Sequence, residues 1–388
     1  LTVGGSATTI FSGVIGGVGG SLSKSGAGTL TLSGANTFTG GVMVSAGSLR
    51  VGNDSALGTG SVGLNGGAVS SDGATARTLT NAYTLGGSVT LGDGTNNGAL
   101  TLSGNGLLAS NALLTTPSTV VLSGVIGGSG GLTKNGSGGL TLSGANTFSG
   151  GVTLNSGGLA IGNDAALGTG SVALGAVGVS SDGNVARTLA NPFTLGSMVM
   201  LGDATKNGAL TFNGAGTLTA NVSVMTNSGV TMNGALSGAF SLTKTGSGEL
   251  MLGGVNTFSG PLVVDGGTLS VMGGAALVNT LAVSVNGSGT LRLVSSEEIG
   301  TLDGVGAVNL QGNALTLSGN ANSTFSGVMV GSGSLLKRRG EWRFGSHRER
   351  WGVGNRGFDV GRRRSLQRFD DGAGVGEWHQ FGGVGDFG

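Results

Sequence analysis

The stretch LTLSGANTF occupies Leu30–Phe38 and returns unchanged at Leu140–Phe148. A third copy, LMLGGVNTF, runs from Leu250 to Phe258, so the copies begin at equal intervals along the chain. Apolar and polar residues alternate within each copy, and this alternation places successive side chains on opposite faces of a β-strand. So short a strand cannot bury its apolar face alone. The stretch therefore predicts a fold in which many similar strands pack against one another.

The repeat extends well beyond these nine residues. VGNDSALGTGSV at Val51 returns as IGNDAALGTGSV at Ile161, and SSDGATARTL at Ser70 returns as SSDGNVARTL at Ser180. Two polar residue types keep the same spacing: Lys24, Lys134 and Lys244, and Asn36, Asn146 and Asn256. The third unit is shorter, because Lys337 follows Lys244 sooner than Lys244 follows Lys134.

Composition favours short strands joined by tight turns. The 388 residues include 86 Gly, 3 Pro and no Cys, and 10% are charged. Glycine does not recur at every third position, which excludes collagen. A hydrophobic fraction of 38% argues against an ordinary disordered chain. The absence of cysteine excludes disulfide staples, and no apolar run reaches the roughly 20 residues of a transmembrane helix.

Two architectures suit such strands: a parallel β-solenoid or a sandwich of hairpins. Apolar pairs recur about every 20 residues, and Asn-Gly or Asp-Gly seldom forms a two-residue loop between matched strands, so we favour the solenoid. The predicted fold class is all-β, a parallel β-helix of roughly 15 coils, with each unit forming about five coils of about 22 residues. Phe38, Phe148 and Phe258 are expected to pack inward.

Charge divides the chain in two. Residues 1–336 hold 8 Lys+Arg and 11 Asp+Glu, whereas residues 337–388 hold 11 and 7 together with all three tryptophans. We therefore predict a β-helix over 1–336 and a separate Arg/Gly/Trp-rich tail over 337–388. The repeat breaks directly after Lys337, which favours a frameshifted reading of the tail. A disordered basic tail and a nucleic-acid-binding segment stay open as alternatives.

Three long stretches carry a resemblance to a known family. LSKSGAGTLTLSGANTFTGGVMVSAGSLRVG, LTKNGSGGLTLSGANTFSGGVTLNSGGLAIG and LTKTGSGELMLGGVNTFSGPLVVDGGTLSV resemble the passenger-associated transport repeat of bacterial autotransporters. They cover somewhat over a quarter of residues 1–336. The resemblance implies a right-handed parallel β-helix on the surface of a Gram-negative bacterium, and a repeat that assists export and folding of the passenger.

The resemblance also implies partners. A passenger of this family is carried out by an outer-membrane β-barrel translocator, which is missing from this chain, and the residues from Leu1 onward do not have the pattern of a signal peptide. We therefore expect a fragment of a longer protein that is anchored at the outer membrane when full length. Host surfaces or neighbouring cells are the expected binding partners; no nucleic-acid partner and no small-molecule substrate is indicated.

Residues 1–336 offer little for catalysis. They contain no His or Cys, which leaves nucleophile–His triads and His/Cys metal sites unavailable there. Their repeated acidic residues stand beside Gly or Asn, which is typical of turn caps: Asp54, Asp72 and Asp93, returning as Asp164, Asp182 and Asp203. Glu297 and Glu298 would point to opposite faces of a strand, and we interpret the pair as solvated surface.

Two motif-like segments fail their context tests. DGTNNG at Asp93 and DATKNG at Asp203 resemble half a calcium loop, but Gly104 and Gly214 stand where the final Glu is required, and the second copy contains Lys206. GTGSVG at Gly58 satisfies G-x-G-x-x-G, but no helix-like segment follows it. No catalytic, cofactor-binding or metal-binding residue is therefore predicted, and no cofactor.

The sequence thus predicts a non-enzymatic passenger fragment, a β-helical stalk that assists export and serves adhesion or biofilm formation. The alternative is a secreted glycan-active β-helix, a polysaccharide lyase or hydrolase, whose active site lies outside this fragment.

Overall fold

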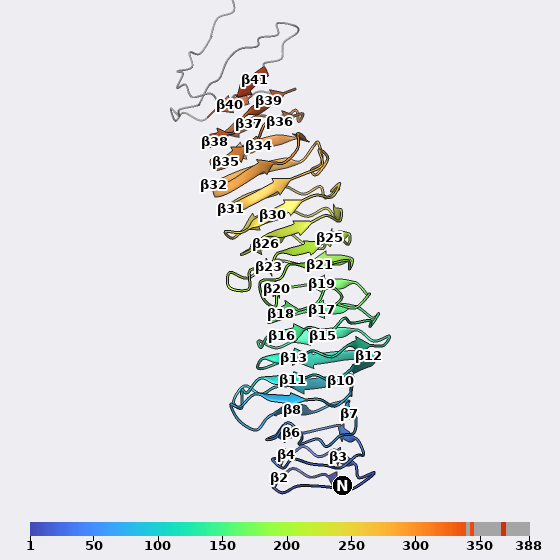
Figure 1. Cartoon of the computed structure of the whole chain (residues 1–388). Coiled ribbons are helices and arrows are strands. Elements are labelled where there is room, and N and C mark those ends of the chain that lie inside the picture. The colour runs from blue at the N-terminus through green and yellow to red at the C-terminus, as the bar shows by residue number, and fades with distance from the viewer. Residues whose placement is uncertain (339–341, 345–365, 370–388) are drawn as a thin grey trace, which may run out of the picture.

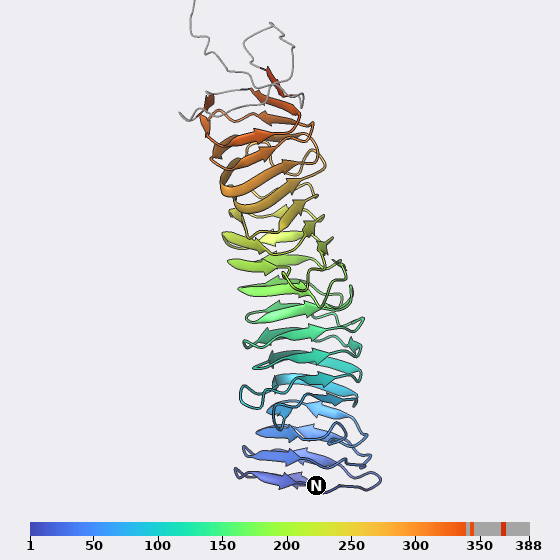
Figure 2. The ribbon, with the colours of Figure 1, turned by 60° about the vertical axis from the view of Figure 1, so that its left-hand side comes forward.

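A computed structural model describes residues 1–338, 342–344 and 366–369. The chain winds into a stack of coils that forms a long rod, seen from two sides in Figures 1 and 2. The described residues contain strands and no helix, and they form a parallel β-solenoid of about 17 turns. The predicted parallel β-helix is confirmed, with more coils than the roughly 15 expected.

Three ladders of strands, parallel except for β41 Leu366–Phe369, form the three faces of the described rod. The first face contains β1 Thr2–Val3, β3 Leu22–Lys24, β5 Val42–Val44, β7 Val62–Leu64, β10 Tyr83–Leu91, β12 Gly106–Thr115, β14 Ile126–Gly127, β21 Arg187–Leu189, β24 Leu210–Phe212, β27 Val230–Met232, β30 Glu249–Leu252, β35 Ala307–Asn309 and β38 Val328–Val330. The second face contains β2 Thr9–Phe11, β4 Thr29–Leu32, β6 Ser48–Val51, β8 Ala68–Ser71, β15 Leu132–Asn135, β17 Val152–Leu154, β19 Val172–Leu174, β22 Phe193–Leu195, β25 Gly216–Leu218, β28 Leu236–Ser237, β33 Glu297–Ile299, β36 Ala314–Leu317, β39 Gly333–Lys337 and β41 Leu366–Phe369. The third face contains β9 Arg77–Leu79, β11 Leu100–Leu102, β13 Val120–Leu122, β16 Leu140–Leu142, β18 Gly158–Ile161, β20 Val177–Ser181, β23 Met198–Leu201, β26 Val222–Thr226, β29 Leu242–Thr245, β31 Leu262–Val271, β32 Ala282–Leu293, β34 Thr301–Gly304, β37 Ser323–Phe325 and β40 Trp342–Phe344.

Four strands are longer than the others, because they run across a corner. β10 and β12 each lie on the first and second faces, and β31 and β32 each lie on the third and first. Where a strand is missing, backbone hydrogen bonds continue the ladder; on the first face Thr147 N donates to Ile126 O (2.8 Å), and Thr169 N donates to Phe148 O (2.9 Å). Among the described strands only β39 and β41 pair antiparallel.

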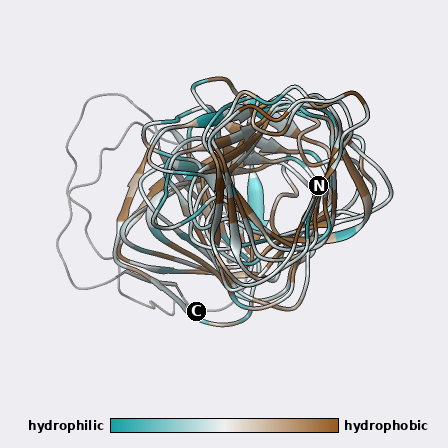
Figure 3. Cartoon of the chain, turned by 90° about the horizontal axis from the view of Figure 1, so that it is seen from below, coloured by the Kyte–Doolittle hydropathy of each residue, from teal (hydrophilic) through white to brown (hydrophobic). Residues whose placement is uncertain are grey.

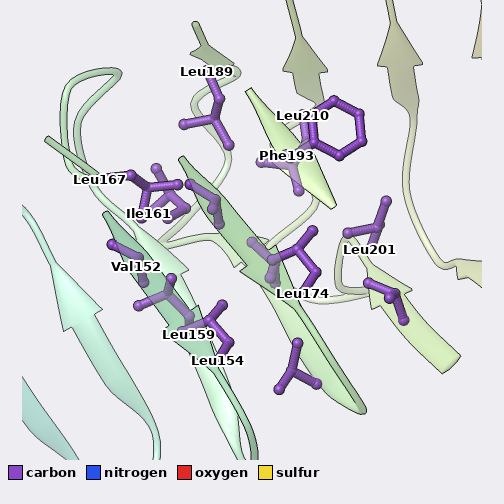
Figure 4. Packing of buried hydrophobic residues seen from close by; sticks show 14 of the residues in the cluster. Val152, Leu154, Leu159, Ile161, Leu167, Leu174, Leu189, Phe193, Leu201 and Leu210 are labelled. Carbon is purple, nitrogen blue, oxygen red and sulfur yellow. The ribbon is translucent and has the colours of Figure 1, made fainter. Parts of the chain in front are cut away.

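The core is one continuous apolar column. Viewed along the rod, the coils superimpose around a shared interior (Figure 3). Leucine and valine of the alternating pairs turn into it, and Leu30 and Leu32 are 0% exposed. Figure 4 shows such side chains from neighbouring coils, for example Val152 and Leu154 of β17 and Leu174 of β19. Burying one Leu or Val side chain stabilises the fold by about 1.5–3 kcal/mol. A single coil buries too few such side chains to be stable alone, so each coil depends on its neighbours.

The repeat unit does not equal a whole number of coils. From Leu22 the first-face ladder takes five steps, through Val42, Val62, Tyr83 and Gly106 to Ile126. Leu132, the counterpart of Leu22, comes one face later, paired with Ala112 on the second face. One unit is therefore five coils plus one face, which makes the prediction of about five coils more exact.

Each copy of the repeat is consequently turned by one face. Lys24 lies on the first face, Lys134 on the second and Lys244 on the third. Two long corner loops follow the same rule: residues 92–99 join the second face to the third, and their counterparts, residues 202–209, join the third face to the first.

Tyr83 supplies a stability test from within the repeat. Its side chain is 4% exposed among Leu57, Leu79 and Leu91, and its hydroxyl has no hydrogen-bond partner among the described residues. The second unit has Phe193 at this station, with its ring centroid 5.0 Å from that of Phe212.

Tyr83→Phe should raise the free energy of unfolding by about 1 kcal/mol, because it removes a buried hydroxyl that lacks a partner. The urea midpoint measures this. Phe193→Tyr is the reverse control and should lower the midpoint; a loss of stability in Tyr83→Phe would contradict the expectation.

Most of residues 337–388 lies outside the described residues, so the domain boundary after Leu336 and the interpretation of the tail stay predictions. Over the part of the chain that the structure describes, no helix is long and apolar enough to cross a membrane.

Candidate functional site: the coil-bridging side chains of the repeat

The lysine of each repeat is buried in a corner of the rod. Lys24, Lys134 and Lys244 are 1%, 1% and 0% exposed. Lys134 Nζ donates to the carbonyl oxygens of Asn135 (3.0 Å) and Gly136 (3.0 Å), and to Ser156 O (3.1 Å) on the next coil. Three donors thus meet three acceptors, so the buried ammonium leaves no donor unpaired.

The other two copies repeat this arrangement. Lys244 Nζ donates to Thr245 O (2.8 Å), to Gly246 O (3.1 Å) and, on the next coil, to Gly266 O (2.9 Å). Lys24 Nζ donates to Gly26 O and, across coils, to the carbonyl oxygen of Ala46 (3.2 Å). The lysine of the Lys-x-Gly motif therefore hydrogen-bonds the corner of its own coil to the corner of the next coil.

A glycine on the next coil makes room for each lysine. Gly157 has φ +80°, and a Cβ there would lie 2.4 Å from Gly136 O and 2.8 Å from Lys134 Nζ. Gly47 and Gly267 stand at the same station with φ +67° and +61°, and a Cβ on either would also approach the lysine. Only glycine takes this conformation without strain and leaves the ammonium its place.

The asparagine of each repeat spans three coils. Asn146 Oδ1 accepts from Ile126 N (2.8 Å) on the preceding coil, and its Nδ2 donates to Ala166 O (2.6 Å) on the following one. Asn36 bridges Ile15 N and Ala56 O, and Asn256 bridges Leu236 N and Ala276 O, all at 2.6–2.8 Å. These side chains are 2–3% exposed.

The phenylalanines pack inward, as predicted. Phe38, Phe148 and Phe258 are 3%, 0% and 0% exposed. A Cβ on Gly168 (φ +65°) of the next coil would lie 2.2 Å from Phe148 O and 3.0 Å from its ring. Gly58 has the same role over Phe38, whereas the third unit has Val278 at this station and the backbone there keeps a negative φ.

Sequence reasoning missed that the lysines are buried. The signal was present, because Lys24 follows Leu22 by two residues in β3, and side chains two apart in a strand share a face. Lys337 ends β39 without the Gly-x-Gly that follows the other three. Among the described residues its Nζ bonds back to the preceding coil, to Gly319 O and Ala321 O, both at 3.2 Å.

The repeated aspartates bind backbone amides or arginines. Asp54 and Asp164 accept from Thr78 N and Thr188 N (both 3.1 Å) on the next coil. Asp72 pairs with Arg77 at 3.5 Å, and Asp182 with Arg187 at 3.2 Å. In the two calcium-like segments, Asp93 Oδ1 and Asp203 Oδ1 accept from the N–H two residues later (2.7 Å each). Hydrogen bonding, led by the Thr205 hydroxyl, lowers the pKa of Asp203 to about 2. The contacts of Asp93 and Asp203 are those of turn-capping carboxylates.

The interpretation of Glu297 as solvated surface was wrong. Glu297 and Glu298 do point to opposite sides, but Glu297 is 4% exposed. Its carboxylate accepts from Leu277 N (2.9 Å) and Ala276 N (3.3 Å) on the preceding coil. Burial raises the pKa of this group against the effect of those hydrogen bonds. Glu298 pairs with Arg338 at 3.0 Å. Within the described ranges no group of three or more His, Cys, Asp or Glu gathers to hold a metal ion.

The repeat lysines predict a rise of stability with pH. Burial lowers the pKa of Lys134 to about 8 and that of Lys244 to about 8. A lysine in the unfolded chain titrates near 10.4. Between these values the unfolded chain binds more protons than the folded one, so the free energy of unfolding increases with pH.

We expect the urea midpoint to rise from pH 7 to about pH 9, which lies below the ordinary tyrosine pKa of about 10. Lys206→Gln, which removes an exposed lysine, is the control and should keep the rise. A flat or falling midpoint in the unsubstituted chain would contradict the burial of these amines.

The stretches that match a known family are those that contain the lysine, asparagine and phenylalanine described above. The family model of the passenger-associated transport repeat matches residues 22–51, 132–161 and 242–271. The adhesin BmaC autotransporter of Brucella suis biovar 1 (strain 1330) is 32% identical over 169 residues, a match that covers 38% of this chain and 5% of that protein. No solved structure matches the chain. The rod carries three passenger-associated transport repeats, and part of it is similar to an autotransporter adhesin.

Proposed function

We propose that this chain is part of a non-enzymatic passenger that stands on the surface of a Gram-negative bacterium as a β-helical stalk. Its transport repeats assist folding during export, and the full-length protein is anchored by an outer-membrane translocator and serves adhesion. The similarity to an adhesin supports the adhesive role. Host surfaces or neighbouring cells are the proposed binding partners, and biofilm formation is the proposed outcome of such contacts.

One observation carries the export role: each repeat contains a lysine and an asparagine that join adjacent coils, and a phenylalanine that packs into the core. Lys134 binds the carbonyl of Ser156 on the next coil, Asn146 binds the coils before and after it, and Phe148 packs under Gly168. A solenoid grows by adding coils to a preformed edge, and its stability is a sum over neighbouring coils. A segment whose coils are joined by such side-chain contacts is therefore where a chain emerging from a pore first forms stable coils, on which later coils can fold.

The export role is tested in the full-length protein with its translocator. Replacing Leu30, Leu32 and Phe38 with Asp should lower surface display about tenfold or more, because three buried carboxylates cannot be accommodated in the core. Antibody labelling of intact cells measures display, and total protein is measured in parallel.

The matched control uses the residues between them. Thr29, Thr31 and Thr37 are at least partly exposed in the same stretch, so replacing these three with Asp adds equal charge outside the core and should leave display nearly unchanged. Equal display of both variants would reject the export role. Adherence of displaying cells to host cells or to one another, compared with non-displaying cells, tests adhesion separately.

A further inference from the structure

We propose that the peptide bond between Lys206 and Asn207 is a cleavage site for an endoproteinase with lysine specificity, and that the cut rod stays in one piece. Water adds across this single bond. The C–N bond breaks, Lys206 gains a carboxylate, and Asn207 becomes a new amino terminus.

The distribution of lysines singles out this bond. The chain contains five lysines. Lys24, Lys134 and Lys244 are 0–1% exposed and lie within strands that are paired on both sides. Lys337 is half-buried, with its ammonium on two carbonyl oxygens. Lys206 is exposed.

The backbone around Lys206 is also accessible. It lies in the loop 202–209 between β23 and β24, which stands out from the stack beside β23 (Figure 1). Residues 204–207 are exposed and belong to no strand ladder. Lys206 N donates to Asp203 Oδ1 (3.1 Å), and Gly208 N donates to Gly183 O (3.0 Å). A protease thus has to open the turn at Asp203, to which Thr205 also donates, and one backbone bond to the preceding coil, whereas cutting at a buried lysine requires separating whole coils.

Ladders across the cut hold the two pieces together. On the first face β21 pairs with β24, on the second β22 pairs with β25, and on the third β23 pairs with β26. Each pair joins a strand before residue 206 to a strand after it. The apolar column also continues across the cut, from Leu201 to Leu210. Hydrolysis at Lys206 therefore leaves the strands of all three faces hydrogen-bonded across the cut.

The first unit supplies a matched control. Its loop 92–99 has the same Asx turn at Asp93, with Asn96 in place of Lys206. The variant Lys206→Gln should lose the cut. Adding Asn96→Lys to that variant should create a new cut after residue 96.

The experiment is limited digestion of the native 388-residue chain with a purified lysine-specific endoproteinase. Intact-mass measurement locates the cuts, and size-exclusion chromatography with and without denaturant follows the association. We expect cleavage after Lys206 at least about 100-fold faster than after Lys24, Lys134 or Lys244. The two pieces should co-elute until denaturant is added.

Several results would overturn the proposal. They are resistance of the Lys206–Asn207 bond, equal cleavage at a repeat lysine, and separation of the pieces without denaturant. Failure of Asn96→Lys to introduce a cut would contradict the argument from loop exposure.

Discussion

Replacing Gly157 with alanine should lower the free energy of unfolding of the coils around the second repeat by roughly 2–5 kcal/mol. A left-handed backbone costs a residue with a Cβ about 1–2 kcal/mol. The new methyl carbon would also lie 2.4 Å from Gly136 O and 2.8 Å from Lys134 Nζ. One of these contacts must give way, and overpacking of this kind costs about 1–3 kcal/mol.

The neighbouring glycine is the control for this prediction. A Cβ on Gly158 would meet only Gly178 O at 4.0 Å, and its φ is not in the left-handed region. Gly158→Ala should therefore be neutral or stabilise by a few tenths of a kcal/mol. Hydrogen exchange followed by mass spectrometry localises the effect to peptides around residues 132–161. Equal exchange in the two variants would mean that the lysine corner does not need a glycine.

The fold could be predicted because its main signal is local. Alternation such as Leu30-Thr31-Leu32 sets one apolar face per strand, and the recurrence of such pairs about every 20 residues leaves few ways to bury them other than coil on coil. The inward position of Phe38 and its counterparts follows from the same alternation. The structure confirms these points, with Leu30 and Leu32 at 0% and Phe38 at 3% exposed.

The rotation of the repeat could not be predicted from spacing alone. The number of residues between copies is compatible with two arrangements. One is five long coils, and the other is five shorter coils followed by one further face. Individual coils vary in length: the step from Tyr83 to its partner Gly106 is longer than the step from Leu22 to Val42, because the long loop 92–99 lies within it. Only the pairing register decides between the two counts.

The burial of the polar residues of the candidate site is the other feature that the sequence analysis did not predict. A lysine or glutamate is normally exposed, and only the acceptors or donors that surround it reverse this expectation. For Lys134 those acceptors include Ser156 O, and for Glu297 the donors are the backbone amides of Ala276 and Leu277. All three belong to a neighbouring coil and are therefore distant in sequence. Alternation shows that Lys134 shares the face of Leu132, but it does not show what lies there.

Asn146→Asp should lower the free energy of unfolding by about 3–5 kcal/mol at neutral pH. Asn146 is 2% exposed, and its Nδ2 lies 2.6 Å from the carbonyl oxygen of Ala166. In the variant a carboxylate oxygen would face that carbonyl, which leaves a buried charge without compensation and a bridge between coils broken. In acid the protonated carboxyl group can again donate to Ala166 O, so the loss should be smaller at pH 4 than at pH 7.

Asn184→Asp is the matched control, because Asn184 is exposed on the same unit and the change there should shift the urea midpoint little at either pH. The three-coil bridge also predicts where the damage appears: amide exchange should speed up at Ile126, whose N–H donates to Asn146 Oδ1, and in the coil that contains Ala166. If Asn146→Asp lowered stability equally at pH 4 and pH 7, loss of shape would explain it better than an unpaired charge. If it left stability unchanged at pH 7, the bonds of Asn146 would not stabilise the stack of coils. The proposal that the repeat assists folding during export would then lose its main supporting contact.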